Sequence, residues 1–195
     1  MDLNLAGKKA LITGASKGIG LAIANRFAME GCSVVLVARR EDDLKQAQRD
    51  ILKTDQSVGV DYRAADLSKT SEVNALAKEQ AEIDILVNNA GAIPAGNINR
   101  VDEVTWRAAW DLKLFGYISL CREIYASMSA RRDEPGQRVI LNIIGAGGER
   151  PSSGYIAGAG ANAGLMAITR AMGGVSRKVK QNTVHVARGR WWYHR

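Results

Sequence analysis

Short apolar runs alternate along the chain with longer segments whose apolar residues recur every three or four positions. The apolar runs span residues 10–13, 32–38, 83–88 and 138–144, and an alternating run covers 58–66. Runs of this length suit strands, and the segments between them are long enough for helices. The pattern therefore predicts parallel strands connected by helices.

The longest helix is predicted over 102–129, where Asp102 and Glu103 lie near the positive end of the helix dipole. One cation, Lys113, interrupts its apolar stripe. A lysine in such a stripe most often carries its ammonium out to water, so a functional ammonium is the alternative. The stripe itself consists of Trp106, Trp110, Tyr117, Leu120, Ile124 and Met128.

The first apolar run leads into a glycine-rich loop, ALITGASKGIG, over residues 10–20. Gly14, Gly18 and Gly20 allow a tight turn, a close approach of the backbone to a pyrophosphate, and close contact between helix and strand. The helix that begins here would receive the phosphates at its N-terminus. Taken alone, the same glycines also fit an ordinary turn in an α/β domain.

The glycine loop does not stand alone, because three further motifs follow it. Thr13-Gly14-x-x-x-Gly18-x-Gly20 is followed by Asp66-Leu67, by Asn88-Asn89-Ala90-Gly91 and by Tyr155. Together they resemble the short-chain dehydrogenase/reductase family over about residues 5–175. The resemblance implies a Rossmann-type, doubly wound parallel sheet with strand order 3-2-1-4-5-6-7. It also implies an NAD(P)-dependent oxidoreductase that transfers a hydride between nicotinamide and a small carbonyl or alcohol substrate.

The same resemblance carries a set of cofactor-binding residues onto this chain. Asp66 would bond the adenine edge, and the backbone amide of Leu67 would help to hold it. Asn88 and Gly91 would make contacts on the cofactor side; the alternative for Asn88 is a turn residue at the end of its strand. The full set is Thr13, Gly14, Ser16, Lys17, Gly18, Ile19, Gly20, Arg39, Asp66, Leu67, Asn88, Ala90 and Gly91.

Two arginines, Arg39 and Arg40, follow the second apolar run, where dinucleotide folds meet the adenosine ribose. An acid at this place would accept hydrogen bonds from a free 2′-hydroxyl, whereas arginine suits a 2′-phosphate. Lys17 could add a second positive charge to that phosphate. The sequence therefore favours NADP(H) over NAD(H), and the alternative is a pair of solvated surface cations.

Of the four catalytic residues that the resemblance implies, only the tyrosine is present. Tyr155 would be the general acid or base, but the lysine expected four residues later, on the same helix face, is Ala159. Gly145 replaces the serine that orients the substrate oxygen, and Lys113 stands near the place of the asparagine. Without the nearby cation the pKa of Tyr155 should lie closer to its free value of about 10, so the pH optimum for alcohol oxidation should rise.

Two replacements for the missing groups are conceivable. Lys113 could reach across and place its ammonium where the absent lysine would sit, which makes it the second candidate catalytic residue. Ser152 or Ser153 could supply the lost hydroxyl, although a polar loop before a helix is the favoured interpretation of each. We expect no metal site.

Charge is concentrated at the C-terminal end. The chain has 195 residues and a net charge of +7, but residues 176–195 hold six basic residues and no acid, which leaves +1 on residues 1–175. We therefore predict an NADP(H)-binding Rossmann domain over 1–175 and a basic tail over 176–195. Trp191, Trp192 and Tyr193 raise nucleic-acid binding as an alternative, but scattered cations without a folded platform argue against it.

Composition also bears on location and assembly. No apolar run approaches the roughly 18 residues needed to span a membrane, and nothing resembles an export signal. Cys32 and Cys121 lie in apolar surroundings, so we expect core thiols in a reducing, cytoplasmic compartment without membrane contact. The small residues after Tyr155 let another helix approach closely, and the resemblance implies a homodimer or homotetramer.

Members of the family continue beyond the position of residue 195 with two more strands and a helix. The resemblance thus implies that the last strands are missing and that the fifth strand forms an edge, with at most a fragment at 183–187 beside it. In another frame the codons of 187–192 are compatible with Pro-Gly-Pro-Val-Val, which matches a turn of the family, so we hypothesise a frameshift. The alternative function is a truncated, catalytically impaired NADP(H)-binding protein.

Overall fold

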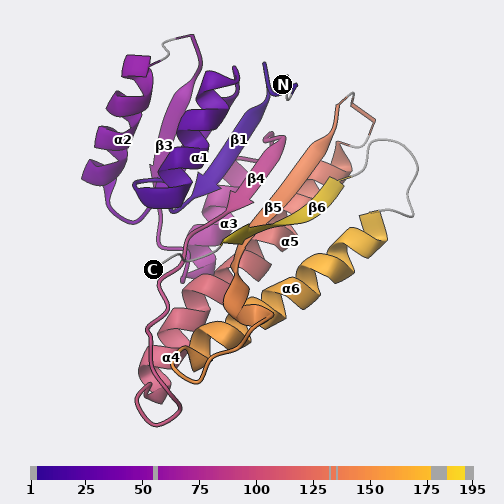
Figure 1. Ribbon diagram of the computed structural model, residues 1–195. Helices are drawn as coiled ribbons and strands as arrows, with labels where there is room; N and C mark the ends of the chain where they lie inside the picture. The colour runs from indigo at the N-terminus through magenta and orange to yellow at the C-terminus, as the bar shows by residue number, and fades with distance from the viewer. Residues whose placement is uncertain (1–3, 55–56, 132, 135, 177–183, 192–195) are drawn as a thin grey trace.

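A single six-stranded parallel sheet forms the centre of the protein (Figure 1). The computed structural model describes residues 4–54, 57–131, 133, 134, 136–176 and 184–191. The strand order is β3-β2-β1-β4-β5-β6, as the family resemblance implies for the first six strands. The strands are β1 (Lys9–Thr13), β2 (Ser33–Ala38), β3 (Val60–Ala64), β4 (Ile85–Asn88), β5 (Arg138–Gly145) and β6 (Val184–Trp191).

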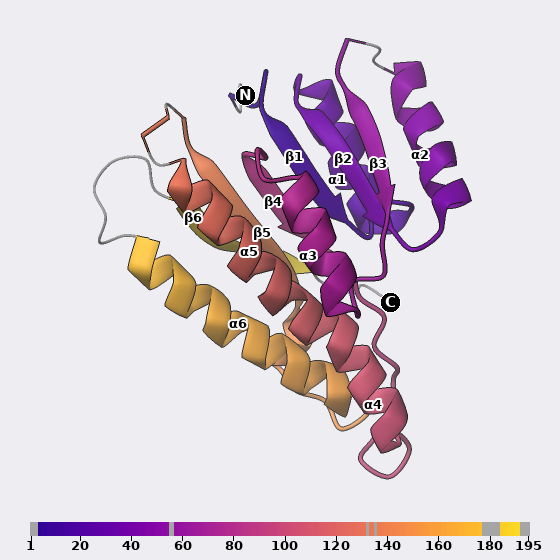
Figure 2. The same cartoon turned by 180° about the vertical axis from the view of Figure 1, so that it is seen from behind.

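Helices cover both faces of the sheet, which confirms the predicted doubly wound α/β fold. One face carries α1 (Gly18–Met29) and α2 (Glu41–Thr54). The opposite face carries α3 (Thr70–Glu79), α5 (Gly116–Ala130) and α6 (Ile156–Ser176), as Figure 2 shows from behind.

The two faces of the sheet contribute to two separate cores, because successive side chains of a strand point in opposite directions. Leu11 and Leu86 pack with α3 and α5, whereas Ile12 and Leu36 pack with α1 and α2. All four side chains are fully buried. Each such burial contributes about 1.5–3 kcal/mol, so strands covered on both sides read as continuous apolar runs.

The segment predicted as one long helix contains a break in its hydrogen-bond pattern. Its parts are α4 (Glu103–Trp110), a π-helical turn η1 (Asp111–Phe115) and α5. Asp102 caps α4 as its position suggested, since its carboxylate accepts the Thr105 N–H at 2.7 Å. The π turn inserts an extra residue into the helix and contains Lys113.

The small residues of α6 receive a side chain of the same protein. A Cβ on Gly160 would lie 3.0 Å from the Trp110 ring, and the indole N–H of Trp110 donates to the Ala157 carbonyl at 2.9 Å. The close approach that these residues allow is therefore used within the chain. The predicted homodimer or homotetramer stays a prediction.

The expectation that β5 forms the sheet edge is wrong. Strand β6 pairs with β5 along its whole length, from Arg138↔Val184 to Gly145↔Trp191. The pairing extends well beyond the predicted fragment at 183–187, of which Thr183 lies outside the described residues. The basic composition of the tail concealed this strand, because Val184 and Val186 are followed by two arginines. Among the described helices, none is long and apolar enough to cross a membrane.

Candidate cofactor groove and active site

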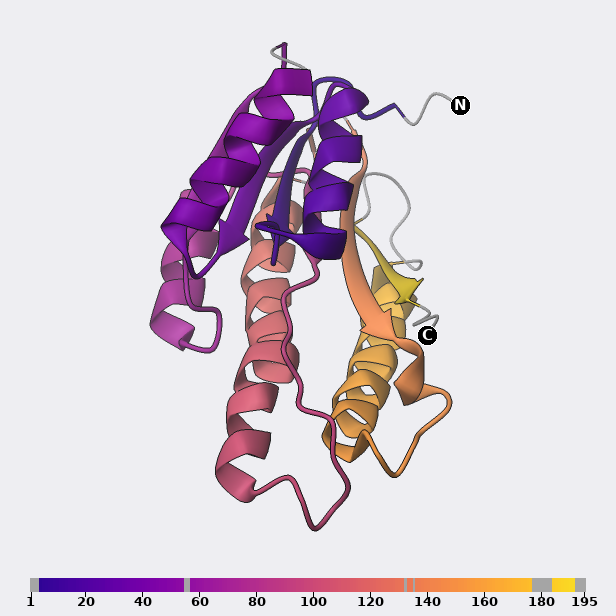
Figure 3. The same ribbon diagram turned by 60° about the vertical axis from the view of Figure 1, so that its left-hand side comes forward.

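A groove of about 530 Å³ lies at the carboxyl ends of the central strands. Its volume is within the range of small-molecule sites, and its position is where parallel α/β sheets bind ligands. Figure 3 shows α4 and the start of α6 extending beyond these strand ends. Of the predicted cofactor residues, eight line the groove: Gly14, Ser16, Lys17, Ile19, Arg39, Leu67, Ala90 and Gly91.

Two glycines of the loop, Gly14 and Gly20, have no room for a side chain. Gly14 and Gly18 have φ values of +66° and +60°, which favour glycine. A Cβ on Gly20 would lie 2.3 Å from the Gly14 carbonyl oxygen, and a Cβ on Gly14 would lie 2.9 Å from the Ala90 Cα. The predicted roles of these glycines in the tight turn and the close helix packing thus have a direct steric reason.

The N-terminus of α1 opens onto this loop without a competing anion. Its N-cap residue, Lys17, makes no side-chain capping bond, and no acid occurs in its first turn. The first N–H groups of a helix are unsatisfied within the helix and favour negative charge. A glycine-rich loop in front of such a terminus fits the pyrophosphate of a dinucleotide.

Thr13 serves to join two loops and is fully buried. Its hydroxyl accepts the N–H groups of Asn89 and Ala90 at 2.9 and 3.0 Å. In return, the Asn89 side-chain amide donates to the carbonyl of Thr13 at 3.0 Å and lines the groove. Asn89 is a site residue that the sequence analysis did not predict, although it belongs to the Asn88-Asn89-Ala90-Gly91 motif.

The side chain of Asn88 does not line the groove. It is buried, and its Nδ2 donates to Asn142 Oδ1 at 2.9 Å and to Cys121 Sγ at 3.2 Å. Asn142 Nδ2 in turn donates to the Thr169 hydroxyl at 2.9 Å. The Asn88 amide therefore connects β4 to β5, α5 and α6 beneath the site.

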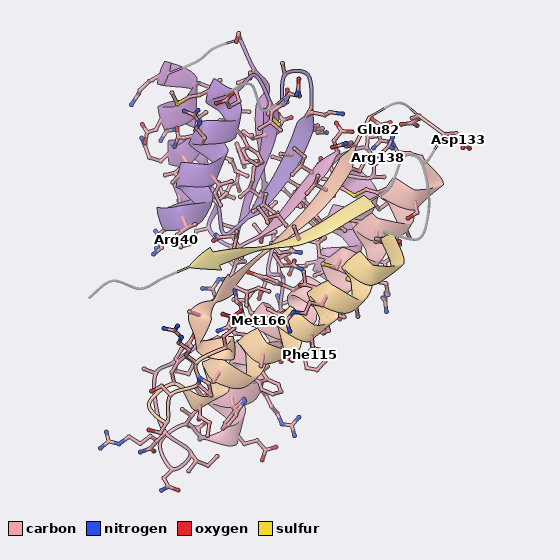
Figure 4. All side chains as sticks on the ribbon, turned by 45° about the vertical axis from the view of Figure 1, so that its right-hand side comes forward. Arg40, Glu82, Phe115, Asp133, Arg138 and Met166 are labelled. Atoms are coloured by element: carbon pink, nitrogen blue, oxygen red, sulfur yellow. The ribbon has the colours of Figure 1, made fainter. Side chains whose placement is uncertain are left out.

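Charged residues surround the end of the groove at β2. Arg40 lies at this end of the sheet, opposite Arg138 (Figure 4), and pairs with Asp43 at 3.2 Å. Arg39 is exposed, lines the groove, and forms no ion pair with the described residues. Asp66, beside the groove-lining Leu67, has a lowered pKa, chiefly because its carboxylate accepts the Ser68 hydroxyl at 2.7 Å.

Tyr155 directly precedes α6, and its ring folds back along this helix. A Cβ on Gly158 would lie 2.0 Å from ring carbons of Tyr155, and one on Gly147 would lie 3.4 Å away. Burial raises the pKa of Tyr155 above its ordinary value, and hydrogen bonding by the Asn162 side chain opposes this effect. The phenol is therefore protonated at neutral pH and able to donate a proton.

Lys113 is held at a different place from the one expected. Its Nζ donates to the Ile143 carbonyl at 2.9 Å and to the Tyr117 hydroxyl at 2.8 Å. Its stem passes Gly91, where a Cβ would lie 2.7 Å from Lys113 Cδ. Burial lowers the pKa of Lys113 to about 8. The hydrogen-bond acceptors of this ammonium are thus Ile143 and Tyr117 and not Tyr155.

The serines before Tyr155 lie in an exposed turn. Both Ser152 and Ser153 are exposed, and the Ser152 hydroxyl accepts the Gly154 N–H at 3.3 Å within its own turn. Sequence reasoning instead missed Asn162, a buried amide whose Oδ1 accepts the Gly145 N–H at 3.0 Å. The available signal was its position seven residues after Tyr155, which is two helical turns on the same face.

A groove of this kind, at the carboxyl ends of a doubly wound sheet and below a helix N-terminus, defines a dinucleotide-binding α/β protein. The profile of the short chain dehydrogenase family matches residues 8–188. The chain therefore belongs to this family of NAD(P)-dependent oxidoreductases.

Individual relatives agree with this assignment. The uncharacterized oxidoreductase YvaG of Bacillus subtilis is 36% identical over 134 residues, which cover 68% of this chain and 50% of that protein. The 3-oxoacyl-(acyl-carrier-protein) reductase FabG of Chlamydia muridarum is 31% identical, with coverages of 95% and 73%. The structure of L-sorbose reductase from Gluconobacter frateurii, complexed with NADPH and L-sorbose, has a TM-score of 0.82 at 31% identity, with coverages of 96% and 70%.

The lowered pKa of Lys113 predicts that the free energy of unfolding increases with pH. The unfolded chain keeps this proton up to a pH of about 10.5, whereas the folded chain releases it from about pH 8. Between these values the unfolded state binds more protons, so stability rises with pH. Relative to Lys113→Met, the free energy of unfolding of the wild type should rise by about 1–2 kcal/mol between pH 7 and pH 9.5.

Urea unfolding of both proteins at the two pH values measures this difference. The methionine variant keeps an apolar stem against Gly91. Because both proteins share all other titratable groups, the contributions of those groups cancel in the comparison. Equal pH dependence of the two proteins would show that Lys113 is not desolvated in the folded state.

Proposed function

We propose that the protein is an NAD(P)(H)-dependent oxidoreductase that transfers a hydride between nicotinamide and a carbonyl or alcohol substrate. The observation that carries the proposal is the uncapped N-terminus of α1, which opens onto the groove at the carboxyl ends of the central strands. Two relatives, a 3-oxoacyl-(acyl-carrier-protein) reductase and an L-sorbose reductase, support carbonyl reduction by their names.

Tyr155 acts as the general acid for reduction. When bound, the nicotinamide supplies the hydride that attacks the carbonyl carbon, or accepts it in the opposite direction. The Tyr155 hydroxyl donates its proton to the substrate oxygen, and it takes this proton back as phenolate during alcohol oxidation. Because the pKa of Tyr155 is raised, the proton-donating form predominates at neutral pH, and oxidation requires a higher pH.

Lys113 supplies the positive charge of the active centre in this proposal. Its ammonium is fixed on the Ile143 carbonyl, two residues before Gly145, and its stem lies against the groove-lining Gly91. The charge thus lies at the end of the groove toward β5, away from Arg39. Its role is to favour negative charge at the reacting oxygen rather than to pair with Tyr155.

NADP(H) is the cofactor that the groove favours. Arg39 is exposed beside the groove and lacks an ion-pair partner among the described residues, while Lys17 lines the same groove. Arg40 pairs with Asp43, an acid that lines the groove. A 2′-phosphate would therefore meet unpaired positive charge.

A catalytically impaired NADP(H)-binding protein is the second candidate. It is favoured by Ala159, which leaves the position one turn after Tyr155 without a cation, and by the absence of a side chain on Gly145. The two functions differ in turnover but not in cofactor binding.

Tyr155→Phe separates these possibilities. With ketones, ketoses and 3-oxoacyl thioesters as substrates, the wild type should oxidise NADPH, and the variant should be slower by about 100-fold or more. Binding of NADPH, followed by its fluorescence, should be unchanged in the variant. Binding by the wild type without oxidation of any substrate would instead identify the impaired binding protein.

Lys113→Met tests the proposed charge. Removal of the ammonium should reduce kcat by about 100-fold, within the range of a lost catalytic group, while the dissociation constant of NADPH stays the same. Steady-state kinetics and fluorescence titration measure the two quantities. A variant with the kcat of the wild type would exclude a role for Lys113 in catalysis.

Arg39→Ala tests the cofactor preference. A charge-assisted hydrogen bond contributes about 1.5–3 kcal/mol, so NADPH should bind roughly 10- to 100-fold more weakly, with NADH changed about twofold or less. Arg122→Ala is the matched control, because Arg122 is an exposed arginine of α5 outside the groove. Equal weakening of both cofactors by Arg39→Ala, or tighter NADH than NADPH binding by the wild type, would contradict the preference.

A further inference from the structure

Tyr117 is a buried phenol that the proposed mechanism does not use. It is 2% exposed, and its ring packs with Ile144 of β5 and with Leu165 and Met166 of α6. Its hydroxyl accepts an N–H of the Lys113 ammonium at 2.8 Å, and the ring centroid lies 4.5 Å from the same nitrogen. The second distance is within the range of a cation–π contact. Tyr117 thus offers Lys113 two favourable contacts from a side chain that is itself held by packing.

The ammonium of Lys113 lies directly behind the wall of the groove. A Cβ on the groove-lining Gly91 would lie 3.4 Å from Lys113 Nζ and 2.7 Å from its Cδ. Tyr117 and the Ile143 carbonyl take two of the three N–H donors of the ammonium. The third donor has no acceptor among the described residues. The charge is therefore close to the groove at a point where the wall has no side chain.

The backbone between the two side chains packs against another groove residue. Gly116, directly before Tyr117, ends the π turn by donating its N–H to the Asp111 carbonyl. A Cβ on Gly116 would lie 2.6 Å from the carbonyl oxygen of Leu67, which lines the groove. The segment that carries Lys113 and Tyr117 is thus seated on the groove wall through a close backbone contact.

The contacts of Lys113 are made with neutral groups. Burial raises the pKa values of Tyr117, Cys121 and Tyr155, so these groups keep their protons at neutral pH. Arg138 belongs to β5 but lies at the end of the strand opposite to Ile143. The other charged side chains of the described helices α4, η1, α5 and α6 are exposed or form surface pairs: Asp111, Arg170, Glu103–Arg107 and Arg122–Glu123.

We propose that Tyr117 is the positioning residue of Lys113: its hydroxyl and ring, together with the Ile143 carbonyl, hold the ammonium against Gly91 with one N–H left for a group bound in the groove. This inference rests on the proposed function, in which Lys113 favours negative charge at the reacting oxygen. An acceptor that is bonded to an ammonium stabilises the charged form. Tyr117 therefore keeps Lys113 charged in a place where burial acts in the opposite direction.

The direct test is a titration of Lys113 that needs neither substrate nor turnover. With an NMR-active carbon isotope at Cε of the lysines, the resonance that is lost in Lys113→Met identifies Lys113. Its chemical shift is then followed against pH in the wild type and in Tyr117→Phe, which keeps the ring and removes only the acceptor. A hydrogen bond to a charged group corresponds to about one to two pKa units, so the pKa of Lys113 should fall by this amount from about 8.

The sign of the change separates positioning from a merely structural role. If Tyr117→Phe only loosened the site, water would reach the ammonium, and the pKa of Lys113 would rise toward its free value of about 10.4. A raised or unchanged pKa would therefore overturn the proposal. Tyr125→Phe is the matched control, because it removes the hydroxyl of another partly buried tyrosine of α5, and it should leave the pKa of Lys113 unchanged.

Kinetics connect this position to catalysis. A pKa lowered by one to two units reduces the charged fraction of Lys113 at pH 7.5, so kcat of Tyr117→Phe for carbonyl reduction should fall about 3- to 25-fold. The alkaline limb of its pH profile should move down by the same interval, and the dissociation constant of NADPH should stay the same. The kcat and pH profile of the wild type in Tyr117→Phe would overturn the proposal. If the wild type shows no turnover, or if Lys113→Met keeps its kcat, the proposed function fails, and the titration still decides whether Tyr117 holds Lys113.

Discussion

The site depends on the crossing of two loops in which no side chain fits between the backbones. The hydroxyl of Thr13 accepts two N–H groups of the loop after β4, and the Asn89 amide returns a bond to the loop after β1. A Cβ on Gly14 or Gly20 would enter backbone at less than 3 Å. The start of α1 and the groove wall at Ala90 and Gly91 are therefore joined by hydrogen bonds and close packing.

The sequence predicted this part of the molecule well because its signals are local. Apolar runs covered on both sides identify buried parallel strands, and β1, β2, β4 and β5 lie where these runs occur. The glycine spacing identifies the loop because positive φ and close packing exclude other residues. Family resemblance then supplied the strand order, which depends on contacts between distant segments.

Side-chain direction could not be predicted in the same way. Thr13 and Asn88 belong to the motifs that were matched, but both side chains point into the protein and connect strands and loops. Motif membership identifies the segment that meets a ligand without distinguishing side chains that contact it from those that support it. The π turn at Lys113 also could not be predicted from the sequence. A single inserted residue leaves the helical spacing of the later apolar residues, such as Tyr117 and Leu120, intact.

Strand β6 and Asn162 were missed for a related reason. The basic composition of residues 176–195 led to the prediction of a tail without a complete strand. Pairing with β5 depends on backbone N–H and C=O groups, which arginines also provide. Asn162 stands among small residues, and its contact with β5 becomes visible only when Gly145 is brought beside it. Residues that act through a partner on another element carry little signal in one sequence.

The alanine at position 159, one helical turn after Tyr155, bears on how this tyrosine ionises. A cation about 4 Å away contributes roughly 4 kcal/mol at an effective dielectric constant of 20, or about three pKa units. A hydrogen bond from an amide contributes about 1 kcal/mol, which does not offset the burial that raises the pKa of Tyr155. At fixed pH both reaction directions are slowed alike, because the overall equilibrium is independent of the enzyme. What changes is the pH range: the phenol keeps its proton over neutral pH, so the site is suited to proton donation and reaches its phenolate form only in alkaline solution.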